Sequence, residues 1–296
     1  MLTATLFNQK TMLVDDADSL GIMANGIFEP IETHTVLALV KGGDRVLDIG
    51  ANMGYYTVLM AEKVGAQGKV FAVEPNAANL SILHANTLAW QQSARVTVMP
   101  CALSDTKGAG SLFLSTHNSG MHRMYASIVC TDEVEKVDIV CGDELSIGTI
   151  DFIKIDIEGY ELKALRGLVS TLQNSPEVKI LSEFSPLSLM EAGESPSQLI
   201  KWMTGQGFAA MGLQDNTWCL LSIDALLASV ERLESLQFAA LVKSLSGLDN
   251  PTILARVMDV ASQRGYDRPI LENLLFVRPH SVGAIEQLEL PRQICP

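Results

Sequence analysis

The stretch RVLDIGANMGYY (45–56) decides the fold of this chain. Its opening residues, RVLDIG (45–50), form a nearly continuous apolar run that ends in glycine, the pattern of a strand buried on both faces of a parallel sheet. Gly50 and Gly54 then lie four residues apart, where missing Cβ atoms let a ligand approach the backbone and permit unusual φ angles. The stretch therefore predicts a strand, a ligand-binding turn and a helix, in that order.

Short apolar runs and helical segments continue to alternate as far as about Pro186. Parallel strands joined by crossover helices have this pattern, so the predicted fold class is α/β, a mostly parallel sheet with helices on both faces. The further predicted strands are KVFAVEP (69–75), RVTVMPCALS (95–104), IDFIKIDI (150–157) and VKILSEF (178–184). The predicted helices are TVLMAEKVGAQG (57–68), ANLSILHANTLAW (78–90) and YELKALRGLVSTLQ (160–173).

Beyond Pro186 the pattern predicts a helix capped by Ser195, short strands near 208–213 and 218–222, and a final strand at 271–279. The residues between, 224–267, have the period and length of two or more helices. These helices either pack or dimerise, or form a lid over the active site. The predicted organisation is an N-terminal segment over the cofactor site (1–40), a core (41–223), a helical insertion (224–267) and the last strand with its tail (268–296).

Composition excludes several classes of protein. The chain has 296 residues, of which 48% are hydrophobic, enough for one large domain with its own core. The formal charge of −13 argues against a nucleic-acid partner, which would require clustered Lys and Arg. The five cysteines are scattered without a two-residue-spaced pair, as expected for reduced thiols in a cytosol. We find no secretory leader and no stretch apolar enough to span a bilayer, so the expected location is cytoplasmic, away from membranes.

Residues at the ends of the first two predicted strands suit a nucleoside that carries a cationic tail. The glycine spacing differs from the G-x-G-x-x-G turn that holds a pyrophosphate. Asp48, in the last turn of its strand, suits an ammonium group better than a phosphate. Glu74 lies near the interval at which an acid accepts hydrogen bonds from ribose hydroxyls, although a plain strand terminus is the alternative. S-adenosylmethionine has an ammonium and no phosphate, and is therefore the expected cofactor.

The third strand end, CALSD (101–105), offers small residues for the adenine ring. Ala102 and Ser104 fit that role, and a routine turn is an equal alternative. At the fourth end, KIDIEGYE (154–161), Asp156 and Glu158 are expected on the same side of an extended segment. They face the sulfonium, accept the acceptor's proton, or cap the following helix.

Two further features concern the acceptor. Glu183 ends the next strand and adds a third acid near the same edge. Such oxygen ligands suit Mg²⁺, but the spacing matches no metal-ligand motif and no metal is expected. In the polar loop THNSGMHRM (116–124), His117 and Asn118 are candidates to hold the acceptor, and His122 is a candidate base because its ordinary pKa lies near 6.5. A solvated surface histidine is the alternative for His122.

Taken together, these segments resemble the FkbM family of S-adenosylmethionine-dependent methyltransferases. The resemblance covers most of residues 26–186 and fades after Pro186. It is carried by GIFEPIET (26–33), GDRVLDIGANMGYYT (43–57), GKVFAVEPNAANL (68–80), ALSD (102–105), HNSG (117–120), IDFIKIDIEGYELKALRG (150–167) and LSEF (181–184).

The resemblance implies a Rossmann-like class I methyltransferase sheet of seven strands with a reversed last hairpin. It also implies O-methylation, with S-adenosylhomocysteine as product. Carried over by residue, it makes Glu74 the ribose acceptor and Asp156 the carboxylate beside the methyl group. Glu29 either closes over the methionine end of the cofactor or caps the helix that follows it. The cofactor loop would comprise Asp48, Gly50, Ala51, Asn52 and Gly54.

The acceptor predicted from this resemblance is a small molecule of natural-product, glycoside, polyketide or peptide type. A homodimer formed through the 224–267 helices is a further expectation. Two readings compete with a methyltransferase: a nucleoside-binding protein of the same fold without catalysis, and a nicotinamide-dependent oxidoreductase. The absent G-x-G-x-x-G turn argues against the second of these.

Overall fold

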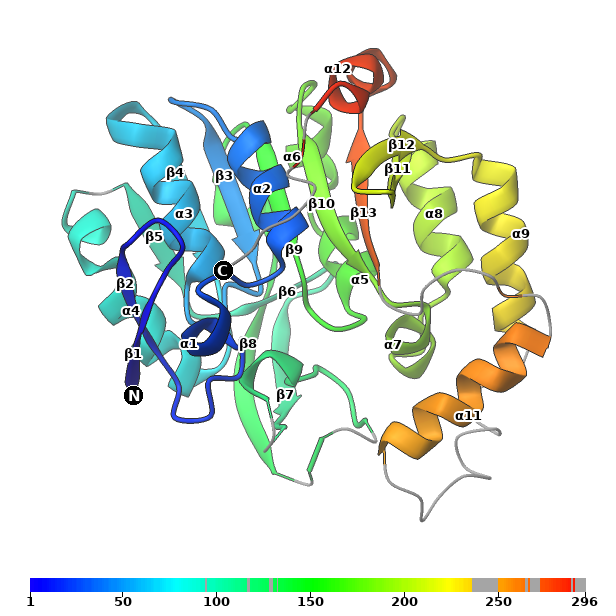
Figure 1. Ribbon diagram of the computed structural model, residues 1–296, viewed down its shortest axis with the longest axis horizontal. Coiled ribbons are helices and arrows are strands. Elements are labelled where there is room, and N and C mark those ends of the chain that lie inside the picture. The colour runs from blue at the N-terminus through cyan, green and yellow to red at the C-terminus, as the bar shows by residue number, and fades with distance from the viewer. Residues whose placement is uncertain are drawn as a thin grey trace.

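An eight-stranded sheet forms the centre of the molecule (Figure 1). The computed structural model describes residues 1–93, 95–115, 118–127, 130–131, 133–235, 250–263, 266, 272–288 and 290. The strand order is β12-β11-β13-β10-β9-β3-β4-β5. The five strands β10, β9, β3, β4 and β5 run parallel, and β13 is antiparallel to both of its neighbours. The strands are β3 (Arg45–Ile49), β4 (Lys69–Val73), β5 (Val96–Met99), β9 (Phe152–Ile155), β10 (Lys179–Phe184), β11 (Ala209–Gln214), β12 (Thr217–Leu220) and β13 (Glu272–Val277).

Helices cover both faces of this sheet because its central strands are apolar on both sides. One face packs against α2 (Pro30–Leu39) and α3 (Tyr55–Val64), in a core that also includes Ile82 of α4 (Ala77–Gln92). The other face packs against α5 (Glu161–Arg166), α6 (Val169–Gln173), α8 (Pro196–Gly205) and α9 (Ile223–Glu234). Short helices follow at α1 (Ile22–Asn25), α7 (Pro186–Glu191) and α12 (Val282–Glu286), with 3₁₀ turns at Gly65–Gln67, Ser119–Met121, Gly142–Leu145 and Pro279–Ser281.

The predicted α/β class is confirmed, with one strand more than the seven expected. The extra strand, β12, pairs antiparallel with β11 at the edge of the sheet. The resemblance implied a reversed last hairpin, and β13 is the reversed strand. It lies between β10 and β11. Ser195 caps α8 as predicted, because its side chain accepts a hydrogen bond from the backbone N–H of Gln198.

Two predicted elements are wrong because each is divided in two. The strand expected at 95–104 breaks at Pro100, which lacks an N–H for the ladder, so that β5 ends at Met99. The next residues form β6 (Ala102–Ser104) in a separate sheet of order β6-β8-β7, with β7 at Gly108–Phe113 and β8 at Val134–Cys141. The helix expected at 160–173 is interrupted at Gly167, where a Cβ would lie 2.0 Å from the carbonyl oxygen of Ser104.

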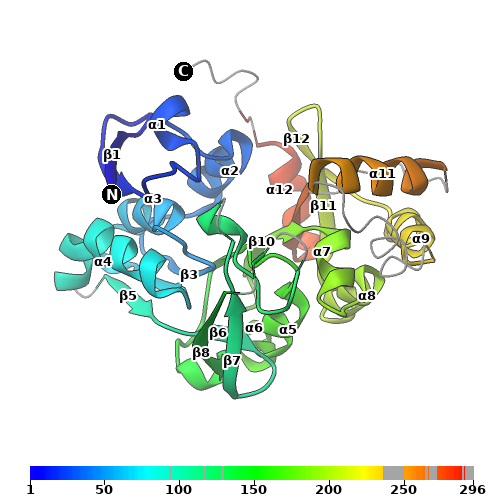
Figure 2. The same cartoon turned by 90° about the horizontal axis from the view of Figure 1, so that it is seen from below.

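The N-terminal and C-terminal additions lie on different sides of the sheet (Figure 2). On the N-terminal side, β1 (Leu2–Thr5) and β2 (Thr11–Val14) form a hairpin whose apolar side chains join the α2 and α3 core. On the C-terminal side, α11 (Asn250–Gln263) packs against α7 and α9. Within the described ranges, no helix combines the length and the apolar character needed to cross a membrane.

Candidate functional site

A pocket opens at the carboxyl ends of β3, β4 and β9, where ligands bind in doubly wound sheets. Six residues predicted from the sequence line it: Gly50, Asn52, Glu74, Ala102, His122 and Asp156. Further lining residues are Ile49, Val73, Pro75, Asn79, Cys101, Leu103, Leu112, Ser119, Gly120, Met124, Ile157 and Tyr160.

The glycine turn brings two strand ends into direct contact. Gly50 has φ +83°, and a Cβ at this position would lie 2.0 Å from the carbonyl oxygen of Asp156. The backbone N–H groups of Gly50 and Ala51 both donate to the carbonyl of Val73. Gly54 has φ +92°, and a Cβ there would lie 2.7 Å from the side chain of Leu83. Glycine at 50 is therefore required both by the backbone conformation and by the close approach of the loop after β9.

Glu74 is fixed at the end of β4 by backbone donors. Its Oε2 accepts a hydrogen bond from the N–H of Asn52 at 2.9 Å, and its Oε1 accepts one from the N–H of Asn76 at 2.8 Å. Burial raises the pKa of this carboxyl to about 7, against the opposing effect of these hydrogen bonds. Each carboxylate oxygen has a further lone pair, so Glu74 is a held acceptor that faces the pocket.

Asp48 lies outside the pocket lining. It is 1% exposed, accepts a hydrogen bond from Thr57 Oγ1, and pairs in register with Lys154 of β9. Burial raises its pKa to about 6. The structure therefore places Asp48 beneath the β3–α3 turn, where it joins the turn to α3, whereas Glu74 is beside the pocket.

Asp156 is joined to a buried lysine. Lys154 Nζ lies 3.0 Å from Asp156 Oδ2, is 1% exposed, and lies 5.1 Å from the centre of the Tyr56 ring. Burial opposes its charge, but Asp156 and Glu29 outweigh burial and raise the pKa of Lys154. A charged lysine at this position fixes the Asp156 carboxylate at the edge of the pocket.

The expectation that Asp156 and Glu158 share one side of an extended segment is wrong. β9 ends at Ile155, and Glu158 adopts φ 55° in a turn that continues with Gly159. The Glu158 side chain therefore has other partners, and its Oε2 accepts a hydrogen bond from the Arg123 guanidinium at 2.8 Å. The backbone N–H groups of this turn donate to Glu161 Oε1 instead.

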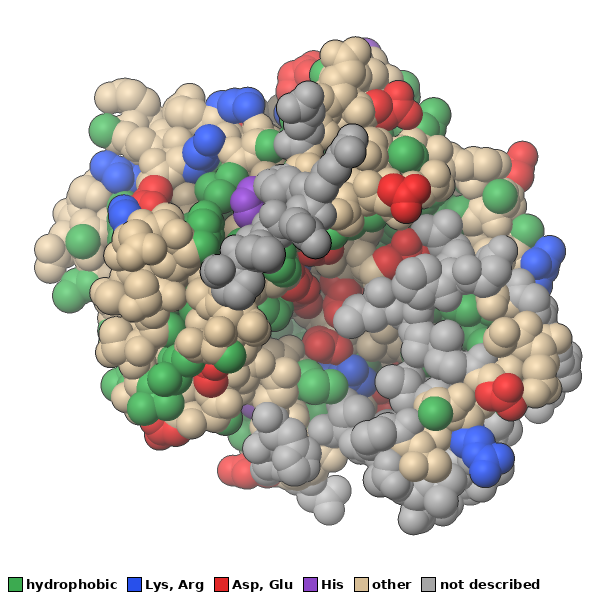
Figure 3. Space-filling view, in the orientation of Figure 1, with side chains coloured by type: hydrophobic (Ala, Val, Ile, Leu, Met, Phe, Trp, Pro, Cys, Tyr) green, Lys and Arg blue, Asp and Glu red, His purple; other side chains and the backbone are tan. Residues whose placement is uncertain are grey.

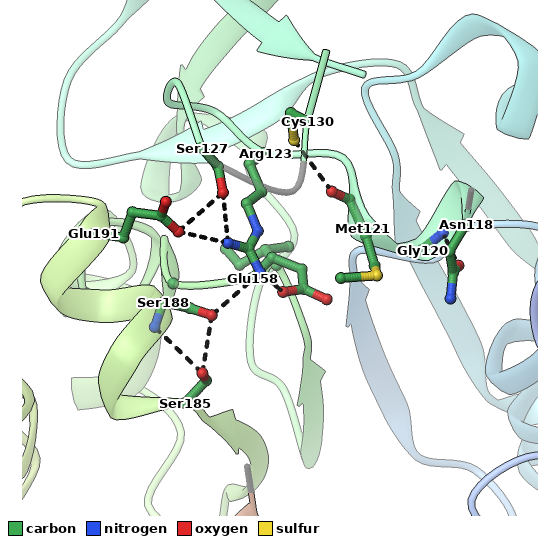
Figure 4. A network of polar contacts seen from close by, with 12 residues as sticks. Asn118, Gly120, Met121, Arg123, Ser127, Cys130, Glu158, Ser185, Ser188 and Glu191 are labelled. Atoms are coloured by element: carbon green, nitrogen blue, oxygen red, sulfur yellow. Dashed lines mark hydrogen bonds and ion pairs between the residues drawn. The ribbon is translucent and has the colours of Figure 1, made fainter. Parts of the chain in front are cut away.

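Residues 118–127 form a segment that we call the strap, which joins the two sides of the pocket (Figure 4). On one side, the Asn79 side chain donates to the Ser119 carbonyl at 3.1 Å. On the other side, Arg123 pairs with Glu158 at 2.8 Å and with Glu191 of α7 at 2.7 Å. Tyr125 Oη also donates to the carbonyl oxygen of Glu158. The strap thus connects α4, the loop after β9 and α7.

His122 and Asn118 of the strap both accept hydrogen bonds from nearby backbone N–H groups. His122 Nδ1 accepts a hydrogen bond from the Ser115 N–H at 3.0 Å, and burial lowers the pKa of the ring. The neutral ring then has its proton on Nε2, which is a donor. Asn118 Oδ1 accepts from the Gly120 N–H at 2.7 Å and shapes the turn. His117 lies outside the described residues.

The two remaining predicted acids lie near Lys154 and Asp156. Glu29 begins α2 with φ 41° but makes no capping hydrogen bond, and its Oε2 accepts one from Tyr56 Oη at 2.8 Å. Burial raises the pKa of Glu29 to about 7. Glu183 is 6% exposed on β10, and burial raises its pKa well above the ordinary value.

Ser104, predicted to lie beside the adenine ring, is buried, and its hydroxyl donates a hydrogen bond to Asp105 at 3.2 Å.

Sequence reasoning missed several residues that the site uses. Asn79 and Tyr160 line the pocket, and their signal was present in the quoted motifs PNAANL and IEGYE. Lys154 and Arg123 gave no signal, because a lysine inside an apolar strand and an arginine in a loop acquire partners only through the tertiary fold. Among the described residues, no cluster of His, Cys, Asp and Glu has the arrangement of a metal site.

The chain matches a known protein family over this same region. Residues 48–210, more than half of the chain, match the model of the methyltransferase FkbM domain. The chain belongs to the FkbM methyltransferase family. A curated relative, the hexuronic acid methyltransferase AglP of Haloferax volcanii, is 27% identical over 138 residues, 44% of this chain and 52% of the relative. This FkbM chain thus spans about half the length of that relative.

Solved structures of methyltransferases are similar to the FkbM chain at low identity. Methyltransferase FkbM from Methylobacillus flagellatus is 18% identical with a TM-score of 0.42, covering 70% of this chain and 54% of that one. The O-methyltransferase from Bacillus cereus in complex with SAH is 17% identical with a TM-score of 0.41, covering 64% of this chain and 76% of that one.

Proposed function

We propose that this protein binds S-adenosylmethionine in the pocket and transfers its methyl group to a hydroxyl oxygen of a small molecule. The observation that carries the proposal is the pairing of a close-approach glycine turn with a held acidic acceptor, Gly50 with Glu74. A nucleoside without a pyrophosphate fits this pair, since the turn lacks the G-x-G-x-x-G spacing.

The pocket residues suit the parts of this cofactor. Glu74 would accept hydrogen bonds from the ribose hydroxyls, and Leu103 and Leu112 give the apolar walls that an adenine ring needs. Asp156 gives negative charge where the sulfonium would lie. When bound, S-adenosylmethionine supplies an electrophilic methyl carbon on a positively charged sulfur.

Other residues of the chain position the acceptor and its proton. In-line transfer depends mainly on alignment, which contributes about 7–11 kcal/mol in well-oriented systems. The acceptor proton would pass to a carboxylate, either Asp156, which lines the pocket, or Glu29, whose pKa near 7 suits a base. His122 is better suited to donate from Nε2 because its Nδ1 is occupied by the Ser115 N–H. Asn118, Glu183 and the Arg123-bound Glu158 remain candidates for holding the acceptor.

The acceptor class is part of the proposal. The name of the curated relative gives hexuronic acid as the molecule it methylates, which supports a sugar-type acceptor here. No metal is proposed in the reaction, since positioning and the carboxylates supply the chemistry that a hydroxyl acceptor needs.

A calorimetric titration with S-adenosylhomocysteine tests the cofactor assignment. We expect binding by the wild-type protein and a loss of about 1.5–3 kcal/mol in the Glu74→Ala variant, because hydrogen bonds to a charged group are removed. Glu144→Ala, which changes a surface acid paired with Lys107, is the matched control and should bind as wild type. Binding of NADH, or unchanged affinity in Glu74→Ala, would contradict the proposal.

Turnover is tested separately with labelled methyl donor and a panel of acceptors. Asp156→Asn should lower turnover more than it lowers S-adenosylhomocysteine affinity. Asp138→Asn, an exposed acid of β8, should change neither quantity. If Asp156→Asn keeps both turnover and affinity near wild type, the role proposed for Asp156 is wrong.

A further inference from the structure

A row of polar side chains continues from the pocket along the carboxyl edge of the sheet. Asp156 follows Ile155, which pairs in register with Ser182, so that Glu183 is its neighbour on β10. Glu183 is in turn directly opposite Asn273 of β13. This row begins at Asp156, which lines the pocket, and continues through Glu183 of β10 to Asn273 of β13.

The start of α2 lies over this row and adds two more acids. Glu32 Oε1 accepts a hydrogen bond from Asn273 Nδ2 at 3.2 Å. Glu29 is close enough to Asp156 and Lys154 for their charges to shift its pKa. Acidic side chains gather in a hollow near the middle of the face that Figure 3 shows. We call Glu29, Glu32, Glu183 and Asn273 the acidic edge.

The cations that contact this region in the described part of the chain already have partners. Lys154 is bound to Asp156 at 3.0 Å and is 1% exposed. Arg123 is bound between Glu158 and Glu191, with its side chain 7% exposed. Neither cation is available to an incoming anion without breaking an existing ion pair.

Among the described residues, no hydrogen-bond donor reaches two oxygen atoms of the acidic edge. They are Glu183 Oε2 and Asn273 Oδ1, on side chains that are directly opposite each other across β10 and β13. Glu183 is more than nine-tenths buried, so bulk water does not replace the missing donor. Adjacent acceptors without donors indicate a ligand group that brings its own O–H hydrogens.

We propose that the acidic edge recognises the acceptor, and that it takes an uncharged, polyhydroxylated molecule and rejects one with a carboxylate. Hydroxyl groups would donate to Glu183 Oε2 and Asn273 Oδ1, and the remaining acids would accept from neighbouring hydroxyls. A carboxylate in the same place would add a negative charge beside Glu29 and Glu32, and it brings no hydrogen to the oxygens of Glu183 and Asn273. This inference rests on the proposed methyl transfer and narrows its acceptor class.

Matched sugar pairs test the inference with the full-length protein. Methyl transfer from labelled S-adenosylmethionine is compared between methyl glucoside and methyl glucuronide, and between the neutral and uronic forms of galactose and mannose glycosides. We expect kcat/KM for the neutral member to be higher by roughly tenfold or more, because a like charge is absent. Equal or better transfer to the uronic members overturns the proposal, and so does transfer to none of the neutral sugars.

Variants locate the discrimination at the acidic edge. Glu32→Gln removes one negative charge, and Glu183→Gln replaces one oxygen of the buried carboxyl by an amide donor. Each change should narrow the preference for neutral sugars. Glu32 is only half-buried, so its variant gives a folded protein even if Glu183→Gln does not. Glu231→Gln, an exposed change on α9, should keep the wild-type preference. An unchanged preference in a folded Glu32→Gln or Glu183→Gln protein contradicts the assignment.

Binding of S-adenosylhomocysteine separates the two proposals. If the protein and its variants bind this product while the sugar preference is absent or reversed, the acidic edge is wrongly assigned and the cofactor site is retained. If the wild-type protein does not bind it, the proposed function itself fails.

Discussion

Glycine is needed at position 50 for two reasons, its left-handed backbone conformation and the lack of space for a Cβ. A comparison with Gly43 separates the two effects on stability. Gly50 has φ +83° and no room for a Cβ, whereas Gly43 has φ +91° with nothing within 4 Å of the same position. Both positions carry the left-handed penalty of about 1–2 kcal/mol for an L side chain. Only Gly50 also keeps the loop after β9 against the turn.

We therefore expect Gly50→Ala to lower the free energy of unfolding by clearly more than Gly43→Ala, and to abolish S-adenosylhomocysteine binding. Chemical denaturation and calorimetry measure the two effects. Gly43→Ala should lose stability by the left-handed penalty alone and bind as wild type. Equal losses in the two variants would mean that the close contact with Asp156 is unimportant.

The raised pKa of Glu74 predicts a pH dependence of cofactor binding. Burial places this pKa at about 7, and the ribose hydroxyls require the ionised carboxylate as acceptor. Binding should therefore weaken as the pH falls below about 7 and should release protons, which calorimetry detects in buffers of different ionisation enthalpy. In Glu74→Gln this component of the pH dependence should be absent. A wild-type affinity that is constant from pH 8 to about pH 5.5 would contradict the prediction.

At this scale the sequence predicted residue types well and partners poorly. Gly50, Glu74 and Asp156 were found because they end strands, and parallel strands end at one edge of the sheet. The ion pairs of Lys154 and Arg123, and the missing donors at Glu183 and Asn273, depend on neighbours that the sequence does not bring together. In the sequence Asp48 and Glu74 both appear as acids near the end of a strand. In the structure Asp48 accepts a hydrogen bond from Thr57 of α3 and does not line the pocket.

Among the elements, the strap depends on one buried cation. Arg123→Ala would leave the Glu158 and Glu191 carboxylates, each 16% exposed, without their counter-ion. We expect a loss of about 3–5 kcal/mol in the free energy of unfolding. Hydrogen exchange should also become faster in residues 118–127. Lys201→Ala, which removes an exposed partner of Glu231, is the control and should change little.

The strap also shows why loops limit prediction from sequence. The segment THNSGMHRM was identified as polar and close to the acceptor, but its anchors lie 35 and 68 residues away along the chain. Local patterns predicted the strands of the central sheet, with a break at Pro100, but the predicted strands do not include β7 and β8 on either side of the strap. Stability of Arg123→Ala close to wild type would show that the strap is held by its other contacts.

For the molecule as a whole, the packing of the C-terminal insertion matters most. The apolar face of α11 is buried inside the chain, because Val257 and Ala261 contact Leu187 of α7 and Leu233 of α9. A lid that packs on α7 would be connected to the strap through Glu191. Dimerisation through these helices, and the domain boundaries 1–40, 41–223, 224–267 and 268–296, stay predictions.

Val257→Asp tests how firmly α11 is attached. Val257 is 1% exposed, so an aspartate there should cost more than about 2 kcal/mol and make residues 250–263 open to proteases. Ala255→Asp, two residues earlier on the exposed face of α11, should change neither stability nor cleavage. S-adenosylhomocysteine binding should persist in both variants, since the pocket lies at the ends of β3, β4 and β9 and no described residue of α11 lines it. Loss of that binding in Val257→Asp would show that the insertion supports the cofactor site.

The position of β13 has a consequence for how the protein is made. This strand, residues 272–277, is inserted between β10 and β11, which are synthesised long before it. Until those residues leave the ribosome, β10 and β11 each present an unpaired edge, and apolar edges of this kind pair readily with other chains. A nascent chain halted before residue 272 would therefore depend on chaperones, and premature stop codons late in the coding sequence would yield aggregates instead of a shortened enzyme.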